Sequence, residues 1–234
     1  MSTPSLCAII GIGPGDGSAL ARRFSIEGQA LALLSRSTGY SEQLVGELGS
    51  ARAYACDAGQ PEQVAEVLAH VAREQGAPET LIYNAGSGVW GSVEDVSAGD
   101  LEAAWRLNVL GAFAAARAVA PAMKERGRGN IIFIGATASL RGGAGTAAFA
   151  QAKAAQRTLA ESMARHWWSA GIHVALIIID GVVDLPRTRQ RMSERPDSFF
   201  VQPDGVAAIA WSLTQQDRSA WSFEVQARPF GEKW

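Results

Sequence analysis

The 234-residue sequence predicts an α/β protein with a doubly wound parallel sheet of about seven strands and helices on both faces. Two observations lead to this prediction. Short apolar runs of five to eight residues alternate with longer amphipathic stretches, which is the pattern of repeated right-handed βαβ units. Runs such as CAII, LALL and ALIII are apolar on both sides, as expected for strands that helices cover on each face.

The strands are expected at the short apolar runs. In chain order they lie near Leu6–Gly11, Ala30–Ser35, Ala53–Cys56, Thr80–Tyr83, Asn130–Ile134, Val174–Ile179 and Ser222–Gln226. The stretches between them predict helices near Ser18–Glu27, Ser41–Leu48, Glu62–Gln75, Asp100–Arg126, Thr146–Ser169 and Asp204–Gln215. The chain length suits one domain with a full hydrophobic core, so we assign residues 1–234 to a single domain.

The least regular region is DGVVDLPRTRQRMSERPDSFFVQPD, residues 180–204, which is rich in Pro, Arg and Asp. It follows the carboxyl end of a predicted strand, where a substrate lid would lie in a sheet of this kind. Phe199 and Phe200 in this region would suit an apolar small-molecule substrate.

The bulk composition narrows the class of protein. A formal net charge of −2 argues against a sequence-independent grip on nucleic acid. No apolar run approaches the roughly 20 residues that span a bilayer, and the chain shows no charged, apolar leader. Cys7 and Cys56 fall in strand-like runs and are expected as small core residues in a reducing compartment. We therefore expect a soluble, cytoplasmic protein that binds neither nucleic acid nor membrane.

The three histidines, His70, His166 and His173, lie far apart in the sequence. A metal site needs clustered ligands, so we expect structural histidines and no metal.

A glycine-rich turn joins the first predicted strand to the first predicted helix. In GIGPGDGSALARRF, Gly11, Gly13, Gly15 and Gly17 crowd this turn. Glycines there let the backbone approach a pyrophosphate while the helix N-terminus offers N–H donors. The alternative is a tight structural turn, but the position between a strand and an amphipathic helix favours a dinucleotide site.

The second strand ends in LLSRS, which bears on the choice of dinucleotide. An acid near this point takes the ribose hydroxyls of NAD, whereas an arginine suits a 2′-phosphate. Ser35 and Arg36 fit the phosphate pattern, and Ser37 could add a hydroxyl donor. We expect NADP(H) over NAD(H), because a guanidinium matches phosphate geometry and no acid competes; the alternative is a solvated arginine at a strand end.

The order of these motifs resembles the short-chain dehydrogenase/reductase superfamily over essentially the whole chain. Gly11, Gly15 and Gly17 match its Gly-xxx-Gly-x-Gly fingerprint, which implies a Rossmann-type fold and a nicotinamide cofactor. Two residues depart from the pattern. Ile10 stands where the family often has threonine, and Asp16 stands where it has an aliphatic residue. A carboxylate beside a diphosphate repels it unless the carboxylate caps the helix or turns away.

The resemblance implies further roles. Asp57 matches the aspartate that contacts adenine, and Asn84, Ala85 and Gly86 match the Asn-Ala-Gly motif on the cofactor's floor. Asn108 matches the helix asparagine that holds a water in the family's proton relay. The remaining assignments to the cofactor site are Lys153, which matches the lysine on the nicotinamide ribose, and Gly181 and Val183 in IIIDGVV.

The usual proton donor of that family is missing. The family places a tyrosine four residues before the lysine and a serine thirteen residues before the tyrosine, which correspond here to Phe149 and Ala136. Phenylalanine has no exchangeable proton, so the family's usual acid–base mechanism cannot run at this position. GATASLRG followed by FAxAK resembles a side branch of the superfamily.

Four residues are candidates for a displaced donor. Thr137 and Ser139 lie beside the serine position and offer hydroxyls. Asp180 stands where the family has the proline of a Pro-Gly pair; a partly buried carboxyl there could act as an acid, and the alternative is a loop-capping aspartate. Lys153 could transfer a proton if burial lowered its pKa, although a ribose contact would keep it charged.

Three functions remain open from the sequence. The first is an NADP(H)-dependent oxidoreductase with a displaced proton donor, or one whose substrate needs little acid assistance, such as an activated C=C or an imine. The second is a catalytically silent NADP(H)-binding sensor or oligomeric partner, and the third is a hydratase or isomerase on the same frame. By resemblance, the helices Asp100–Arg126 and Thr146–Ser169 pair across a two-fold axis, which implies a homodimer or homotetramer.

Overall fold

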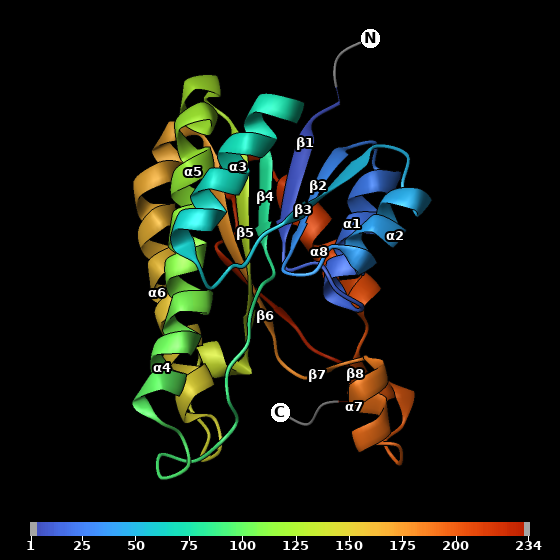
Figure 1. Cartoon of the computed structure of the whole chain (residues 1–234), viewed down its shortest axis with the longest axis vertical. Helices are drawn as coiled ribbons and strands as arrows, with labels where there is room; N and C mark the ends of the chain where they lie inside the picture. The colour runs from blue at the N-terminus through green and yellow to red at the C-terminus, as the bar shows by residue number, and fades with distance from the viewer. Residues whose placement is uncertain (1–3, 232–234) are drawn as a thin grey trace.

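The computed structural model describes residues 4–231 and contains one seven-stranded parallel sheet (Figure 1). The strands lie in the spatial order β3-β2-β1-β4-β5-β6-β9. Their bounds are β1 Leu6–Ile10, β2 Ala30–Ser35, β3 Ala51–Ala55, β4 Thr80–Tyr83, β5 Gly129–Ala136, β6 Ile172–Ile179 and β9 Glu224–Ala227. Every neighbouring pair is parallel, so the predicted doubly wound sheet is confirmed.

Helices cover both faces of the sheet, as Figure 1 shows. One face carries α3 (Pro61–Gln75), α5 (Gly111–Arg126) and α6 (Ala147–Trp167), and α4 (Ala98–Trp105) packs against α6. The other face carries α1 (Asp16–Ile26), α2 (Gly39–Glu47) and α8 (Pro203–Thr214). Two separate hydrophobic clusters result, one on each side of the sheet.

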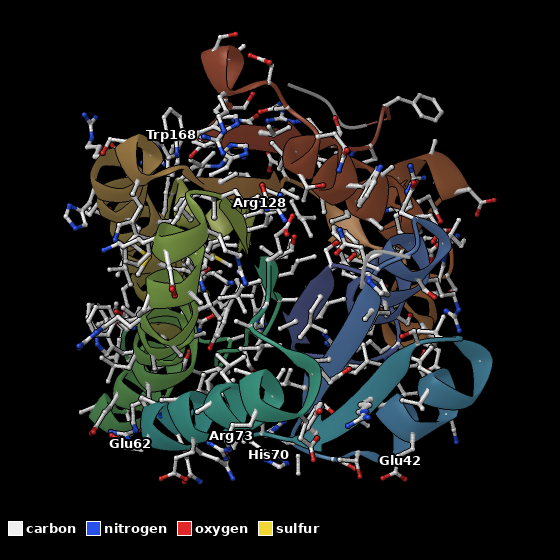
Figure 2. The ribbon with its side chains drawn as sticks, turned by 90° about the horizontal axis from the view of Figure 1, so that it is seen from above. Glu42, Glu62, His70, Arg73, Arg128 and Trp168 are labelled. Atoms are coloured by element: carbon white, nitrogen blue, oxygen red, sulfur yellow. The ribbon has the colours of Figure 1, made fainter. Side chains whose placement is uncertain are left out.

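Helix α3 illustrates why the sequence forms these layers. Val64, Leu68 and Val71 recur at helical spacing and are buried against the sheet. Figure 2 shows Glu62, His70 and Arg73 of the same helix along the outer edge of the molecule, directed away from the sheet. Pro61 begins the helix, where its missing N–H removes no hydrogen bond.

The order of the strands creates a crevice beside β1. The chain crosses from β1 to β2 on one side and from β3 to β4 on the other, so β1 lies between β2 and β4. The connections that leave the carboxyl ends of β1 and β4 therefore run to opposite faces of the sheet. In open α/β sheets, ligands bind at this topological switch point.

The prediction of a single regular helix over Asp100–Arg126 is wrong, because the helix is interrupted. The structure places a five-residue π-helical turn, η1 (Arg106–Leu110), between α4 and α5. The side-chain amide of Asn108 donates to Ala104 O at 2.8 Å and to Ser87 O at 2.7 Å. This side chain therefore competes with the regular helical hydrogen bonds, which is a known cause of such a bulge.

The region 180–204 is more ordered than its composition predicts. It contains β7 (Val182–Val183), α7 (Pro186–Arg191) and β8 (Phe200–Val201), and the two short strands pair with each other. Arg189 holds the region together, because it donates to Asp184 and Asp197 at 2.6 Å and lies 4.1 Å from the centroid of the Phe200 ring.

The expectation that Phe200 serves an apolar substrate is wrong. Its side chain is buried within the region 180–204, beneath Arg189. Phe199 is half-buried, and its ring lies 4.9 Å from the guanidinium carbon of Arg195. Both rings therefore stabilise this region itself.

The described residues also bear on the expectations from composition. Cys7 and Cys56 are both buried and unpaired. Within residues 4–231, no three His, Cys, Asp or Glu side chains gather to hold a metal ion. Nor does that part of the chain contain a helix long and apolar enough to cross a membrane.

A glycine at the start of α5 generates a stability prediction. A Cβ atom added to Gly111 would lie 2.1 Å from Ala58 O and 2.4 Å from Tyr83 Oη. We expect Gly111→Ala to lower the free energy of unfolding by about 1–3 kcal/mol, because the main chain of α5 must move away from the sheet. Urea-induced unfolding measures this change.

Gly46→Ala in α2 is the matched control. Nothing lies within 4 Å of its added Cβ, so the substitution should raise the free energy of unfolding by about 0.5–1 kcal/mol through helix propensity. Equal stability of Gly111→Ala and the unsubstituted protein would contradict the close packing of α5.

Candidate functional site

A cleft of about 910 Å³ opens at the carboxyl edge of the sheet, at the switch point beside β1. Four parts of the chain line it: the glycine-rich turn after β1, the ends of β2, β3 and β4, helix α4, and the beginning of α7. Its size suits an extended small molecule such as a dinucleotide. Most of the residues assigned to the cofactor from the sequence lie along this one cleft.

The glycine-rich turn presents its backbone to the cleft. Gly11 and Gly15 have positive φ angles of 98° and 114°, which side chains rarely tolerate. A Cβ on Gly17 would lie 2.7 Å from Gly11 O, so the turn closes tightly against α1. Nothing lies within 4 Å of a Cβ added to Gly13, which leaves that part of the turn open. This arrangement fits a phosphate group held by backbone N–H donors at the start of α1.

The turn is tied to the neighbouring strand by Asn84. Its side-chain amide donates to Gly11 O at 2.7 Å, and its backbone N–H donates to Ile10 O at 2.9 Å. Ala85 lies directly against Gly11, because a Cβ on that glycine would be 2.4 Å from Ala85 N. Asn84 and Ala85 thus fix the floor of the cleft, and Gly86 continues it.

Asp16 is the first residue of α1 and lines the cleft. It does not cap the helix, because the hydroxyl of Ser18 makes the capping bonds with Gly15. One carboxylate oxygen of Asp16 is buried without a hydrogen-bond partner. Burial raises the pKa of this carboxyl from 3.8 to about 6. A carboxyl group of this kind accepts a bound diphosphate more readily when it is protonated.

The ends of β2 and β3 form the other part of the cleft. Arg36 is exposed and lines it, and so does Asp57, whose Oδ1 accepts from Gly59 N at 2.9 Å. Ser35 also lines the cleft, but its hydroxyl is engaged: it donates to Ser37 O at 2.9 Å and lies 2.6 Å from the Ser41 hydroxyl. Ser37 is exposed outside the lining of the cleft.

Lys153 lies at the centre of a buried network. Its Nζ donates to Ile134 O at 2.8 Å and to Gln156 Oε1 at 3.0 Å. The side-chain amide of Gln156 in turn donates to the main-chain oxygen of Asn108 at 2.7 Å. Gly86 leaves room for the lysine, because a Cβ there would lie 3.0 Å from Nζ. Burial lowers the pKa of Lys153 from 10.5 to about 7.

Gln156 was not among the residues that the sequence predicts for the site. The available signal was a polar residue three positions after Lys153 on an otherwise alanine-rich helix, which places the two side chains on one face. Asn108 is fully buried, and its Oδ1 has no hydrogen-bond partner. That oxygen lies on the Gly86 side of the network, 3.2 Å from the same added Cβ.

Phe149 stands one turn before Lys153 and packs on the loop after β4. A Cβ added to Gly88 would lie 2.8 Å from Phe149 Cβ, so this glycine permits the contact. The ring centroids of Phe149 and Trp90 lie 5.8 Å apart with 30° between the planes. Lys153 Nζ lies 5.9 Å from the Phe149 centroid. Trp90 is a second residue that sequence reasoning missed, because a loop tryptophan carries no pattern that would assign it.

Ala136 ends β5, and four polar side chains lie beyond it. Ser139 is buried and its hydroxyl accepts from Ala136 N at 3.2 Å, so it is directed under the strand end. Thr137 donates to Asp180 Oδ1 at 2.6 Å. Arg228 pairs with the other oxygen of Asp180. Asp180 is therefore an acceptor held between a hydroxyl and a guanidinium, and it is buried.

The sheet register explains why Thr137 and Asp180 meet. Ala136 of β5 pairs with Ile179 of β6, so the residues that follow each strand lie side by side. Gly181 and Val183 follow Asp180 but are not among the residues that line the cleft. A Cβ on Gly181 would lie 2.8 Å from Pro229, and Val183 O accepts from the Thr188 hydroxyl at 2.6 Å.

A parallel sheet wound in this order, with a glycine turn and a cleft at its switch point, defines a dinucleotide-binding fold. A model of the short chain dehydrogenase family matches residues 6–196, which is most of the chain. The chain therefore belongs to the short-chain dehydrogenase family, whose members are oxidoreductases that use nicotinamide cofactors.

Individual relatives agree with this assignment. The 2-(S)-hydroxypropyl-CoM dehydrogenase 3 of Xanthobacter autotrophicus is 27% identical over 227 residues, which cover 89% of each chain. The inactive 2-(S)-hydroxypropyl-CoM dehydrogenase 2 of the same species is 30% identical over 205 residues, or 82% of this chain and 89% of its own.

Two solved structures are similar over nearly their full length. A short-chain dehydrogenase from Rhodopseudomonas palustris has a TM-score of 0.84 at 33% identity and covers 97% of this chain and 99% of its own. A metagenomic short-chain oxidoreductase in complex with NADP has a TM-score of 0.83 at 25% identity and covers 99% of this chain and all of its own.

The position of Asp16 predicts that dinucleotide binding is linked to proton uptake. The folded-state pKa of about 6 lies above the ordinary 3.8, so the carboxyl is neutral below about pH 6 and charged above it. We expect NAD to bind about tenfold more tightly at pH 5 than at pH 8, because the diphosphate is repelled only by the charged form. Calorimetric titration across this range measures the effect.

Asp16→Asn is the control for this linkage. It should remove the part of the pH dependence that Asp16 carries and bind NAD at pH 8 more tightly than the unsubstituted protein does, while the part carried by Lys153 remains. An unchanged pH profile in Asp16→Asn would show that another group, such as Lys153, carries the proton.

Proposed function

We propose that this chain is an NADP(H)-dependent oxidoreductase acting on a small molecule whose reduction needs no proton from a tyrosine. The observation that carries the proposal is the combination of an open glycine turn and cleft with a lysine whose neighbour one turn earlier is Phe149. When bound, the reduced nicotinamide would supply a hydride. The residues of the chain would bind the dinucleotide, orient the substrate and exclude water.

The residues that line the cleft fit the dinucleotide in a definite order. The open turn at Gly13 and the start of α1 would hold the diphosphate through backbone N–H groups. Arg36 and Asp57 would lie at the adenosine end, because β2 and β3 are on one side of β1. Gly86 and Lys153 would lie at the nicotinamide end, beyond β4 on the other side of β1.

Arg36 supports the choice of NADP(H) over NAD(H). Its side chain is exposed at the cleft directly after β2, where it can meet a 2′-phosphate. The nearby Ser35 hydroxyl is already used within the turn, so the guanidinium would carry most of this recognition. The similar metagenomic oxidoreductase was solved with NADP.

We propose that Phe149 and Ala136 stand at the positions of the family's tyrosine and serine, and that no displaced group replaces them. Thr137 directs its proton to Asp180, which is itself held by Arg228. Ser139 is directed under the strand end. Each of these groups contributes to the structure of the strand ends, and their arrangement supports a site that transfers hydride without an enzyme-borne acid.

The second candidate is a catalytically silent NADP(H)-binding protein that senses redox state or acts as a partner in an oligomer. One observation favours it: a relative at 30% identity is itself an inactive 2-(S)-hydroxypropyl-CoM dehydrogenase. Both candidates require the dinucleotide, so a titration that finds no affinity for NADPH or NADH would remove both.

We also propose assembly as a homodimer or homotetramer through α5 and α6, which are rich in alanine and permit close approach. The two buried, unpaired cysteines support a reducing, cytoplasmic location.

The role of Arg36 gives a direct test of cofactor choice. We expect Arg36→Asp to weaken NADPH binding by about 10- to 100-fold, because a charge-assisted bond to phosphate becomes a repulsion. NADH binding should change less than about threefold, since NADH lacks the 2′-phosphate. Fluorescence titration with both dinucleotides measures the difference.

Arg52→Asp provides the matched control, because Arg52 is an exposed arginine of β3 that pairs with Glu74 and does not line the cleft. It should leave both affinities unchanged. Equal losses for NADPH and NADH in Arg36→Asp would refute the phosphate contact.

The missing donor gives a gain-of-function test. We expect the double substitution Phe149→Tyr, Ala136→Ser to create slow, NADPH-dependent reduction of simple ketones, because the tyrosine hydroxyl would stand one turn from Lys153. The unsubstituted protein should show no such activity. Phe149→Leu, Ala136→Ser is the control that adds a serine and no tyrosine. Ketone reduction by the unsubstituted protein at the same rate would contradict the assignment of Phe149.

A further inference from the structure

Phe149 is half of an open aromatic surface. The centroids of its ring and that of Trp90 lie 5.8 Å apart, and the two planes are tilted by 30°. Gly88 holds the loop against Phe149, because any side chain at this position would collide with Phe149 Cβ. Trp90 is 72% exposed, so its ring is accessible from solvent beside the cleft that Gly88 and Val89 line. Phe149 is half-buried, and Lys153 Nζ lies 5.9 Å from its ring centroid. Aromatic faces carry negative electrostatic potential and attract cations.

The chain around this aromatic pair is acidic. Between residues 88 and 105 the sequence contains four acids and no lysine or arginine: Glu94, Asp95, Asp100 and Glu102. Asp95 packs against Gly91, next to Trp90, and Asp100 lines the cleft. Hydrogen bonds from Ser92 lower the pKa of Asp95, and bonds from Ser97 lower that of Asp100, so both are charged at neutral pH. This edge of the cleft therefore favours a cation over an anion.

Lys153 is the amine beside the aromatic pair, and its hydrogen bonds go to amide oxygens. The described contacts of Lys153 Nζ are Ile134 O, Gln156 Oε1 and the face of Phe149, and none of these groups titrates. The side-chain amide of Gln156 in turn donates a hydrogen bond to the main-chain oxygen of Asn108. Ile134 O and Gln156 Oε1 therefore hold the amine as acceptors that carry no acidic proton. With its pKa lowered to about 7 by burial, the amine is mostly neutral at pH 8.

From these contacts we propose that the Trp90–Phe149 pair binds a planar cation of the iminium class, a C=N⁺ group, as the substrate of the NADP(H)-dependent activity proposed above. The substrate class rests on that proposed function. A hydride from the reduced nicotinamide forms one C–H bond at the iminium carbon. The π electrons of the C=N⁺ bond become a lone pair on nitrogen, and the cation becomes a neutral tertiary amine. No proton moves, whereas a ketone would leave an alkoxide that needs one.

Binding can be measured without turnover. The probe is 2-methyl-3,4-dihydroisoquinolinium, whose charge is permanent, and 3-methyl-1,2-dihydronaphthalene is the neutral molecule of the same shape. We expect calorimetric titration to give at least about tenfold tighter binding of the cation, which corresponds to a desolvated cation–π contact. Equal affinity for the two molecules overturns the proposal.

Two variants and one control assign the contact. Trp90→Leu and Phe149→Leu should each weaken the cation about tenfold and change the neutral molecule less than about threefold. Trp105→Leu removes another exposed tryptophan, on α4 and outside the pair, and should change neither. If the three variants lose affinity for the cation equally, the pair is not the binding surface and the proposal fails.

NADPH titration separates this inference from the proposed function. Binding of NADPH with no preference for the cation leaves the proposed function standing and refutes the substrate class. Binding of the cation with no affinity for NADPH refutes the proposed function and, with it, the substrate role of the cation. When both bind, NADPH oxidation should follow addition of the cation and not of the ketone 1-tetralone; the reverse preference overturns the proposal.

Discussion

The contact between the end of β1 and the end of β4 is the constraint on which the rest of the site depends. Gly11 and Ala85 approach so closely that a Cβ on the glycine would overlap the backbone of Ala85. The side-chain amide of Asn84 also donates a hydrogen bond to Gly11 O. Since the two strands send their connections to opposite faces, this contact fixes both walls of the cleft at once. The position of the glycine turn relative to Gly86, and hence to Lys153, follows from it.

Two ionisable groups of this arrangement have pKa values that burial shifts toward the neutral form. Asp16 has its pKa raised to about 6 and Lys153 has its pKa lowered to about 7, one at the start of α1 and the other on α6. Neither has an opposite charge as a partner in its described contacts. A bound anionic dinucleotide would raise the pKa of both groups, because negative charge favours the protonated form of each. Ligand binding and proton uptake are therefore linked on both sides of the cleft.

The sequence predicts the frame far better than the details of the site. The runs that form β2 and β4 were expected with the bounds that the structure gives, because each is apolar on both faces and bounded by polar residues. The π-helical turn at Asn108 was not expected, since it depends on a bond to Ser87 O, 21 residues away in the chain. The burial of Phe200 likewise depends on Arg189, whose carboxylate partners lie on either side of α7. Contacts of this kind arise from tertiary structure and leave no local pattern.

Gln156 satisfies the hydrogen-bonding groups that surround the buried Lys153. A buried amine with unmade hydrogen bonds costs free energy, and a phenylalanine at position 149 can offer Lys153 only the face of a ring. Gln156 supplies the missing acceptor and satisfies its own amide on Asn108, so the lysine keeps two hydrogen bonds without a hydroxyl nearby. The phenylalanine and the glutamine form one arrangement around the lysine, in which a ring face and an amide oxygen both contact its amine.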